Sequence, residues 1–465
     1  GCIMGSKNLK AIAARGTRGI KVHDPEGFLQ VVRELFHLMD SNLARYSFKK
    51  NGTVGIADMY EQIGDLAYRN DQYCLTPRPK LDKLRASWAY EHVKRGDLSC
   101  SPGCTSGCGS WLTVRGDESP YAQRLRDTIT AGPELYATVT FGMACDVPDF
   151  VAVTALNSLC NYYGIDGIEM GSLIPFLMEL WERGIITERE TEKWCGEPIS
   201  FTWGNMAAIE KTIESVGLQN NDLGRLLQRG IVPAAQEIER LTEQPTLPYA
   251  CYAKGEVAFQ KEIRSFPSWA IGFAVSSRGA DHLKGVNMVE KASREDISRA
   301  WLDGDPGAGK PFCPDRKGAV TAYAENRNAA INALGICCFR PVFDPLELNL
   351  NILARAFQAL TGFEMTGARL YQVGERICNL EKAFNSRVGL RRQDDLLCQR
   401  WMKDPLPDGP GKGMKAEDYF ETLLNEYYEF KGWDKSTALQ TQDKLLELGL
   451  EEVAEVLVRE KALST

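Results

Sequence analysis

A short pattern occurs twice in this chain, and it constrains the fold because its second copy ends in a cysteine. Residues 161–166 read N-Y-Y-G-I-D, and residues 332–337 read N-A-L-G-I-C. The glycine of the first copy ends an apolar helical pattern, and Gly335 allows the sharp turn that presents the residue after it. The matched loops predict two equivalent binding positions around one site.

Three more cysteines lie upstream in a loop of small residues. Residues 100–109 read C-S-P-G-C-T-S-G-C-G, which places Cys100, Cys104 and Cys108 four residues apart. The proline and glycines argue against a helix, and small side chains let a loop wrap around a compact inorganic group. Three clustered cysteines plus one distant cysteine supply the four ligands of an iron–sulfur cluster. We expect Cys337 to be the fourth ligand, with Cys338 as its competitor.

Two alternatives for the cysteine loop fit less well. A zinc site usually needs a second cysteine pair or histidines at short spacing, and neither lies near this loop. A radical-SAM motif needs C-x-x-x-C-x-x-C, and the last spacing here is one residue too long.

The composition is that of a globular protein in a reducing compartment. Of 465 residues, 44% are hydrophobic and 25% are charged, and the net charge of −7 implies no general affinity for nucleic acid. We find no apolar run near 18 residues and no secretory signal. The 14 cysteines therefore predict a few metal-ligating thiols in the cytoplasm, and not a disulfide scaffold. Cys160, Cys378 and Cys398 lie in apolar helical patterns and are expected to be buried structural thiols.

Helical periodicity dominates after the first twenty residues and predicts a mainly α fold. The clearest helices are expected after Asp24-Pro25, from Asp149 to Tyr162 and from Ser172 to Arg183. Further helices are expected near 206–216, 222–230, 293–302, 346–361, 373–385, 416–430 and 436–461. Residues 303–314 and 404–414 are expected to be surface loops.

The chain is expected to comprise two helical domains after a short N-terminal remnant. Prolines near residues 244–250 favour a boundary there, which gives domains at 24–250 and 251–465. Residues 1–23 open in the middle of an element, and Leu9–Ala14 could be the last strand of a sheet domain. We therefore expect the chain to be a fragment that lacks an upstream domain.

Five segments, in order along essentially the whole chain, resemble the tungsten-dependent aldehyde:ferredoxin oxidoreductase family without its first domain. They are residues 4–12, the cysteine loop 100–108, residues 156–166 with the helix that follows, residues 272–283 and residues 332–337. The resemblance implies one tungsten (or molybdenum) atom held by two pyranopterins, beside a four-iron four-sulfur cluster. Each repeated loop would hold one pterin, through Asn161, Gly164, Ile165 and Asp166 in one copy and Asn332, Gly335 and Ile336 in the other.

The chain departs from the family pattern at two places. Both loops open with asparagine where the family has aspartate, so each hydrogen bond to a pterin would lose its charge assistance. The family's cysteine loop usually reads C-x-x-C-x-x-x-C, so Cys104 and Cys108 match it and Cys100 lies one residue out of place.

The resemblance also implies groups for proton transfer near the metal. His282 is the only histidine in a matching segment, and a histidine can donate or accept a proton near neutral pH. The family places a carboxylate in the segment that matches residues 132–137. Counting along the chain puts Tyr136 at that position, and a shift of register would put Glu134 there.

The sequence therefore predicts an oxidoreductase that converts an aldehyde to a carboxylic acid and passes electrons through the cluster to ferredoxin. One alternative is a tungsten subunit of the benzoyl-CoA reductase type, since a phenol at position 136 is a poor base at neutral pH. Another is an iron–sulfur electron-transfer subunit without a working pterin site. The expected partners are ferredoxin and a small-molecule substrate, with no nucleic acid and no membrane. A homodimer is a further expectation, because family members are often dimers.

Overall fold

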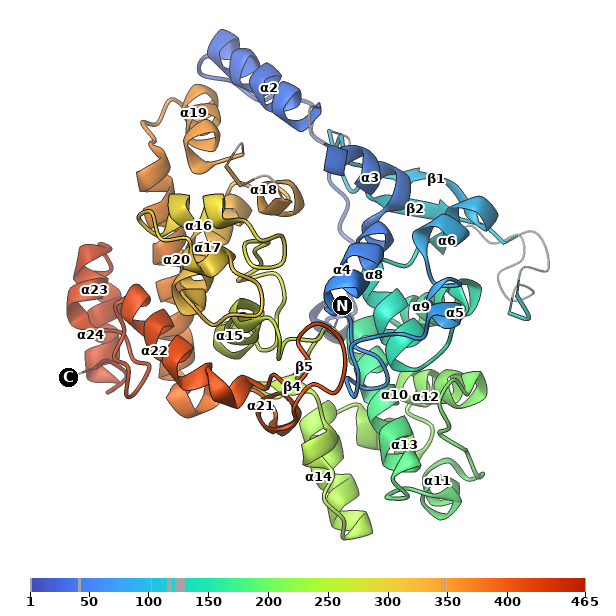
Figure 1. Ribbon diagram of the computed structural model, residues 1–465. Helices are drawn as coiled ribbons and strands as arrows, with labels where there is room; N and C mark the ends of the chain where they lie inside the picture. Colours follow the sequence, from blue (N-terminus) through green and yellow to red (C-terminus); the bar gives the residue numbers. More distant parts are fainter. Residues whose placement is uncertain are drawn as a thin grey trace.

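A computed structural model describes residues 2–40, 43–101, 103–114, 119–121, 130–343, 345–346 and 348–464. Most of the described chain is helical, which confirms the predicted fold class. In Figure 1 most of the blue-to-green first half of the chain lies opposite the yellow-to-red second half, but the blue helix at residues 25–40 lies beside the second half. None of the helices in the described ranges is both long and apolar enough to cross a membrane.

In the part of the chain that the structure describes, the first half holds fifteen helical segments and a small antiparallel sheet. The helices are α1 Cys2–Ser6, α2 Pro25–Asp40, α3 Leu43–Asn51, η1 Thr53–Ile56, α4 Ala57–Ile63, α5 Arg78–Leu81, α6 Ala86–His92, α8 Leu135–Ala137, the π-helix η2 Thr138–Ala144, α9 Phe150–Tyr163, α10 Gly167–Glu182, α11 Glu188–Cys195, α12 Met206–Leu218, α13 Asp222–Leu227 and α14 Ile231–Thr242. The sheet has the order β1 Lys94–Leu98, β2 Gly109–Leu112, β3 Thr130–Ala131.

The second half is built around helices, with one two-stranded ribbon. The ribbon pairs β4 Tyr252–Ala253 with β5 Glu256–Val257. The helices are η3 Leu247–Tyr249, α15 Pro267–Val275, α16 Glu295–Trp301, η4 Gly307–Gly309, α17 Lys317–Ala333, α18 Phe339–Phe343, α19 Leu350–Thr361, α20 Gly367–Arg387, η5 Arg392–Asp394, α21 Gln399–Lys403, η6 Ala416–Asp418, α22 Phe420–Lys431, α23 Gln442–Glu447 and α24 Glu451–Arg459.

Helices α9 and α10 form the centre of the first half. Both are apolar on most of their surface, so they lie inside the largest hydrophobic cluster and not on its edge. Asp149 caps α9 by accepting from the N–H of Ala152, and Asp166 caps α10 by accepting from the N–H groups of Ile168 and Glu169.

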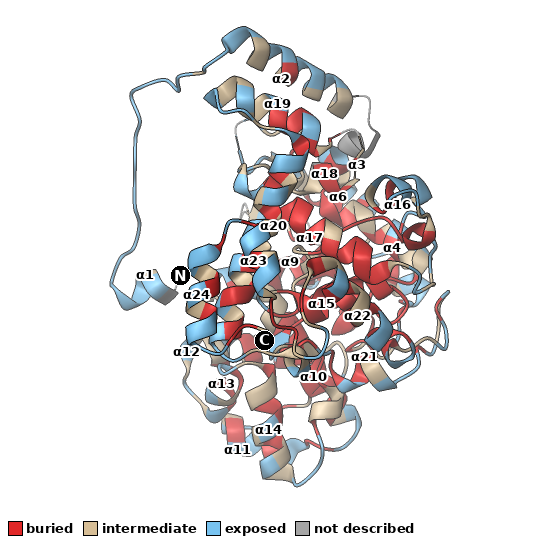
Figure 2. Cartoon of the chain, turned by 90° about the vertical axis from the view of Figure 1, so that its left-hand side faces the viewer, coloured by how far each residue is buried: buried red, intermediate tan, exposed pale blue. Residues whose placement is uncertain are grey.

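Helix α17 is the central helix of the second half. It packs against α15, α20 and α22 and is almost entirely buried, as Figure 2 shows. Several of its buried side chains are polar, and other elements satisfy them. Arg327 donates to the carbonyl oxygens of Pro341 and Leu348, and Lys431 donates to Asn326.

Most of the expected helices are present, with shifted boundaries. The helix expected from Ser172 begins at Gly167, because Asp166 supplies the cap five residues earlier than expected. The single helix expected at 436–461 is wrong. It is two helices, α23 and α24, separated at Gly449, which has a φ of 64° in the left-handed region.

The N-terminal expectations were partly wrong. Residues 9–14, expected to be a strand, are exposed and pair with no other described segment. The chain between α1 and α2 runs along the outside of the molecule (Figure 2). Helix α2 is present and packs on α19, but Leu29 and Phe36 of its apolar stripe are exposed.

Of the three cysteines expected in the core, Cys160 and Cys398 are buried and Cys378 is half-buried. The division into domains at residue 250 stays a prediction.

Helices α17 and α20 cross so closely at Gly374 that one added methyl group is expected to destabilise the protein strongly. A Cβ atom at Gly374 would lie 1.8 Å from the carbonyl oxygen of Asn326, a backbone atom that cannot swing away. We expect Gly374→Ala to lower the free energy of unfolding by about 2–3 kcal/mol. The matched control is Gly272→Ala in α15, whose nearest neighbour, Thr321 Cγ2, would lie 3.8 Å away. Chemical denaturation measures both, and equal stability of the two variants would contradict the close crossing.

Candidate functional site

The two copies of the repeated pattern adopt the same backbone geometry. Gly164 ends α9 with a φ of 69°, and Gly335 follows α17 with a φ of 70°. In both copies the glycine N–H donates to the carbonyl oxygen of the motif asparagine, at 3.2 Å from Asn161 and 3.0 Å from Asn332. The isoleucine that follows donates to the residue before the asparagine, at 2.9 and 3.4 Å. This pair of bonds is a Schellman helix end, which needs a left-handed residue.

Both helix ends face open space. A Cβ atom at Gly164 or at Gly335 would find no atom within 4 Å. Asn161 and Asn332 are exposed, and each isoleucine is half-buried against its own half of the molecule. The two loops therefore present exposed asparagine side chains and open glycines, and these features fit a bound group of substantial size. Asp166 differs from the other motif residues because its carboxylate is engaged in capping α10.

The structure brings the distant cysteine next to the upstream cysteine loop. Cys104 and Cys337 both raise the pKa of the Cys108 thiol, although burial is the largest cause and Glu134 contributes more than either. The pKa of Cys108 rises to about 11. Cys100 and Cys104 raise the pKa of the Cys337 thiol, again after burial. Cys108 and Cys337 therefore each have two of the other cysteines as neighbours, as ligands of one iron–sulfur cluster would.

Within the described ranges, no three or more histidine, cysteine, aspartate or glutamate side chains lie close enough together to hold one metal ion. Cys338 also lies at this place, half-buried beside Cys337.

The cysteines open onto a cavity of about 370 Å³ where the two halves of the chain meet. Cys100 and Cys108 line it from the first half, and Cys337 and Cys338 from the second. Its other walls are mostly apolar or aromatic, formed by Ile56, Tyr60, Leu135, Phe259, Trp269, Leu283, Val286, Met288, Phe339, Val342 and Phe343. Such a chamber, with few polar groups, is typical of a site for a small organic molecule.

Glu134 and Tyr136 both line the cavity but point to different neighbours. The Thr53 hydroxyl donates to the Glu134 carboxylate, which lies near Cys108 and has a pKa raised by burial. The Tyr136 hydroxyl donates to Asn157 Oδ1 at 2.6 Å, and its ring lies against Gly167 at the start of α10. Burial raises the pKa of Tyr136 to about 12. Glu134 therefore belongs to the cysteine end of the cavity, and Tyr136 to the side of the first repeated loop.

His282 lines the cavity beside Phe259, with ring centres 5.0 Å apart. Burial lowers the pKa of His282 to about 4. Asp281 opposes that shift, and Lys261 and Lys291 add to it. The imidazole is therefore neutral at pH 7 and can accept a proton. Asp281 forms an ion pair with Arg278 and accepts from the N–H of Leu283.

No local sequence pattern points to two of the residues at this site. Thr53 and Lys261 lie far along the chain from every motif and reach the cavity only through the packing of η1 and of the segment after β5. Both interact with acidic side chains, Glu134 and Asp65, that are distant in sequence.

A family model described as aldehyde ferredoxin oxidoreductase, domains 2 and 3, matches residues 30–450. The chain belongs to this family. The family match agrees with the resemblance that the motifs carry, and it covers both repeated loops, the cysteines and His282.

Curated relatives support the same assignment. Tungsten-containing aldehyde ferredoxin oxidoreductases of Pyrococcus horikoshii and Pyrococcus furiosus are each 26% identical to this chain, over 97% of it and 68% of their own length. A protein of Pyrococcus furiosus named aliphatic sulfonate oxidoreductase, WOR-like subunit, is 25% identical over 99% of this chain and 67% of its own length. The chain is thus a member of the aldehyde ferredoxin oxidoreductase family that is similar to tungsten oxidoreductases.

A solved structure has the same fold. The active site complex BamBC of benzoyl coenzyme A reductase, in complex with 1,5-dienoyl-CoA, superposes with a TM-score of 0.75 at 20% identity. The match covers all of this chain and 71% of the other. At this identity the likeness shows the fold alone.

The half-buried His282 predicts an acid-sensitive contribution to stability. The folded protein holds His282 with a pKa of about 4, below that of a histidine in an unfolded chain, so the unfolded state binds a proton first as the pH falls. We expect the wild type to lose roughly 3 kcal/mol of stability from this group between pH 7 and pH 4. His282→Gln should remove that loss, whereas His37→Gln on α2 should not. Chemical denaturation at both pH values is the measurement, and an unchanged pH dependence in His282→Gln would contradict the burial of this ring.

Proposed function

We infer that this protein is a tungsten (or molybdenum) bis-pyranopterin oxidoreductase that oxidises an aldehyde to a carboxylic acid. The observation that carries the proposal is that cysteines from both halves of the chain, Cys100 and Cys108 from the first and Cys337 from the second, line one cavity together with the neutral His282. In addition, the two repeated helix ends have closely similar geometry and face open space. Family membership supplies the class of chemistry.

The residues that would hold the cofactors follow from this arrangement. Cys100, Cys104, Cys108 and Cys337 would ligate a 4Fe-4S cluster. The two repeated loops would each hold one pterin through the asparagine amide and the backbone beside the glycine. When bound, the metal–pterin group supplies two-electron redox chemistry, and the cluster supplies a one-electron exit to ferredoxin.

The protein's own groups would then bind the substrate and move protons. Oxidation of an aldehyde to a carboxylic acid takes one oxygen atom from water and releases two electrons and two protons. The apolar walls bury the substrate's carbon chain and exclude water. His282 is neutral and can accept a proton at a ring nitrogen, and Glu134 is a second acceptor at the cysteine end. We place this reaction in the cytoplasm.

A second candidate is the reduction of an aromatic acyl-CoA ring. It is favoured by the position of Tyr136, whose hydroxyl is held by Asn157 and can donate a hydrogen bond but not act as a base. The aromatic lining of the cavity would suit such a ring. An iron–sulfur subunit without pterin is the third possibility, and the asparagines that replace the family's aspartates are a motivation for it.

Cofactor analysis separates these candidates. The protein should be purified anaerobically from cells supplied with tungstate and molybdate. We expect tungsten or molybdenum, about four iron atoms per chain, and the fluorescent oxidation product of the pterin. Iron without pterin would favour the electron-transfer subunit. Absence of tungsten, molybdenum and iron together would overturn the proposal.

The assignment of the fourth cluster ligand has its own test. Cys337→Ala should abolish the cluster signal in electron paramagnetic resonance and lower the iron content, because the thiol is a direct ligand. Cys338→Ala, one residue away and half-buried, should keep both. A cluster signal that survives in Cys337→Ala and disappears in Cys338→Ala would exchange the two roles.

Glu134 and Tyr136 can be separated by paired substitutions that keep their shapes. We expect Glu134→Gln to lower kcat by about 100-fold or more, as loss of a proton acceptor does. Tyr136→Phe should lower kcat by about tenfold or less for aldehyde oxidation, because it removes only a hydrogen bond. Tungsten and iron contents must match the wild type in both variants. The reverse order of effects would favour ring reduction.

A further inference from the structure

His282 lies in a loop of irregular backbone that other elements must hold in place. This histidine loop, residues 276–286, follows helix α15. Gly279 turns the loop with a φ of 94°, and the N–H of Asp281 donates to the carbonyl oxygen of Gly279 at 2.7 Å. Bonds within so short a segment leave many conformations open, so contacts from outside the loop decide where the imidazole points.

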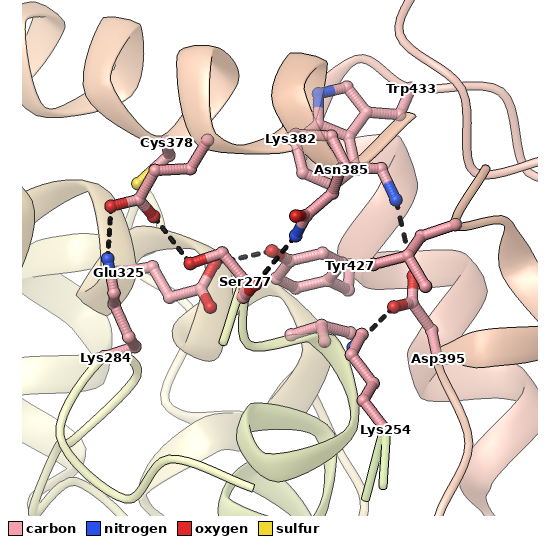
Figure 3. Close-up of a pocket in the computed structure, with 13 residues that line it drawn as sticks. Lys254, Ser277, Lys284, Glu325, Cys378, Lys382, Asn385, Asp395, Tyr427 and Trp433 are labelled. Atoms are coloured by element: carbon pink, nitrogen blue, oxygen red, sulfur yellow. Dashed lines mark hydrogen bonds and ion pairs between the residues drawn. The ribbon is translucent and has the colours of Figure 1, made fainter. Parts of the chain in front are cut away.

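Glu381 of helix α20 binds the histidine loop near both of its ends. One carboxylate oxygen, Oε2, accepts from the Ser277 hydroxyl at 2.7 Å, and the other forms an ion pair with Lys284. One turn further along α20, Asn385 Nδ2 donates to the carbonyl oxygen of Ser277 at 2.7 Å. In Figure 3, Ser277 and Lys284 point toward the helix that carries Asn385. One carboxylate thus joins residues on both sides of His282, and bonds to a charged group are stronger than neutral ones.

Helix α17 holds the end of the same loop. Asn328 Nδ2 donates to the carbonyl oxygens of Lys284 and Val286, at 3.1 and 2.9 Å. Both acceptors belong to the backbone, so these bonds fix the path of the chain. Helix α17 also leads into the second repeated loop, and it packs along α20. The histidine loop and the second repeated loop are therefore attached to the same pair of helices.

Glu381 itself does not line the cavity. It lines a small second pocket between α20 and the histidine loop, together with Ser277 and Lys284. His282 and Leu283, from the part of the loop between those two residues, line the cavity. The loop thus has one side against α20 and the other against the cavity, so a group that holds the first side determines where the second side lies.

We propose that Glu381 is a positioning residue that holds the histidine loop so that His282 faces the cavity. It does not touch the substrate, and it acts through the backbone on both sides of the imidazole. The role of His282 as a proton acceptor rests on the proposed function. The hold on the loop does not, because it consists of bonds within this structure. Without them, we expect the imidazole to leave its place beside Phe259 for part of the time.

A second ion pair on α20 provides a matched control. Glu375 binds Lys444 of α23 at 2.8 Å, and both side chains are 13% exposed. Glu381 and Lys284 are 34% and 24% exposed, so the control pair is the more buried of the two. A purely structural role of Glu381 would therefore predict that Glu375→Gln has an equal or larger effect than Glu381→Gln.

Hydrogen–deuterium exchange, followed by mass spectrometry on the anaerobically purified protein, tests the hold directly. The N–H groups that donate within the loop report its opening, and they belong to Arg278, Asp281 and Leu283. We expect Glu381→Gln to speed exchange in the histidine loop about tenfold or more, because a bond to a charged group is lost. Ser277→Ala keeps the ion pair and should give a smaller increase. Glu375→Gln should leave this exchange at the wild-type rate.

Kinetics with benzaldehyde as the probe, and a viologen dye as electron acceptor, tests what the hold does for the reaction. His282→Gln is the reference and should lower kcat about 100-fold or more. At metal and iron contents equal to the wild type, we expect Glu381→Gln to lower kcat about tenfold and to change KM less than about twofold, because the apolar walls still bind the aldehyde. Glu375→Gln should keep the wild-type kcat.

The outcomes separate this inference from the proposed function. Equal loop exchange in Glu381→Gln and Glu375→Gln, whether both are fast or both slow, overturns the inference. It is also wrong if His282→Gln loses activity while Glu381→Gln keeps it. If the loaded protein oxidises no aldehyde, or if His282→Gln keeps full activity, the proposed function or the role of His282 in it is wrong, and the exchange rates alone decide whether Glu381 holds the loop.

Discussion

The geometry of the site depends on the way in which one buried helix, α17, is held. Its polar side chains could not be buried without partners, and they find them on elements from across the second half. Arg327 binds two backbone carbonyl oxygens, and Tyr427 donates to Glu325. These bonds fix the axial position of the helix, and its end carries Gly335 and Cys337 to the cysteine loop of the first half. Helix α9 performs the same task for the first loop, with an apolar surface in place of a polar one.

The motifs and the helices could be predicted from the sequence because both depend on local physics. A left-handed glycine after a helix is a property of a few residues, so Gly164 and Gly335 were identified together. The strand expected at residues 9–14 was wrong because a strand needs a partner, and apolar residues alone do not supply one. The helix boundary at Gly449 was missed because a glycine inside an apolar pattern also occurs within helices.

The electrostatics of the cavity could not be predicted from the sequence in the same way. Lys261 and Lys291 look like ordinary surface residues in the chain, and only tertiary packing places them on one carboxylate. The orientation of Glu134 and Tyr136 likewise depends on Thr53 and Asn157, which belong to other elements. Family resemblance identified both candidates but could not choose between them, since a shift of two residues exchanges a carboxylate for a phenol.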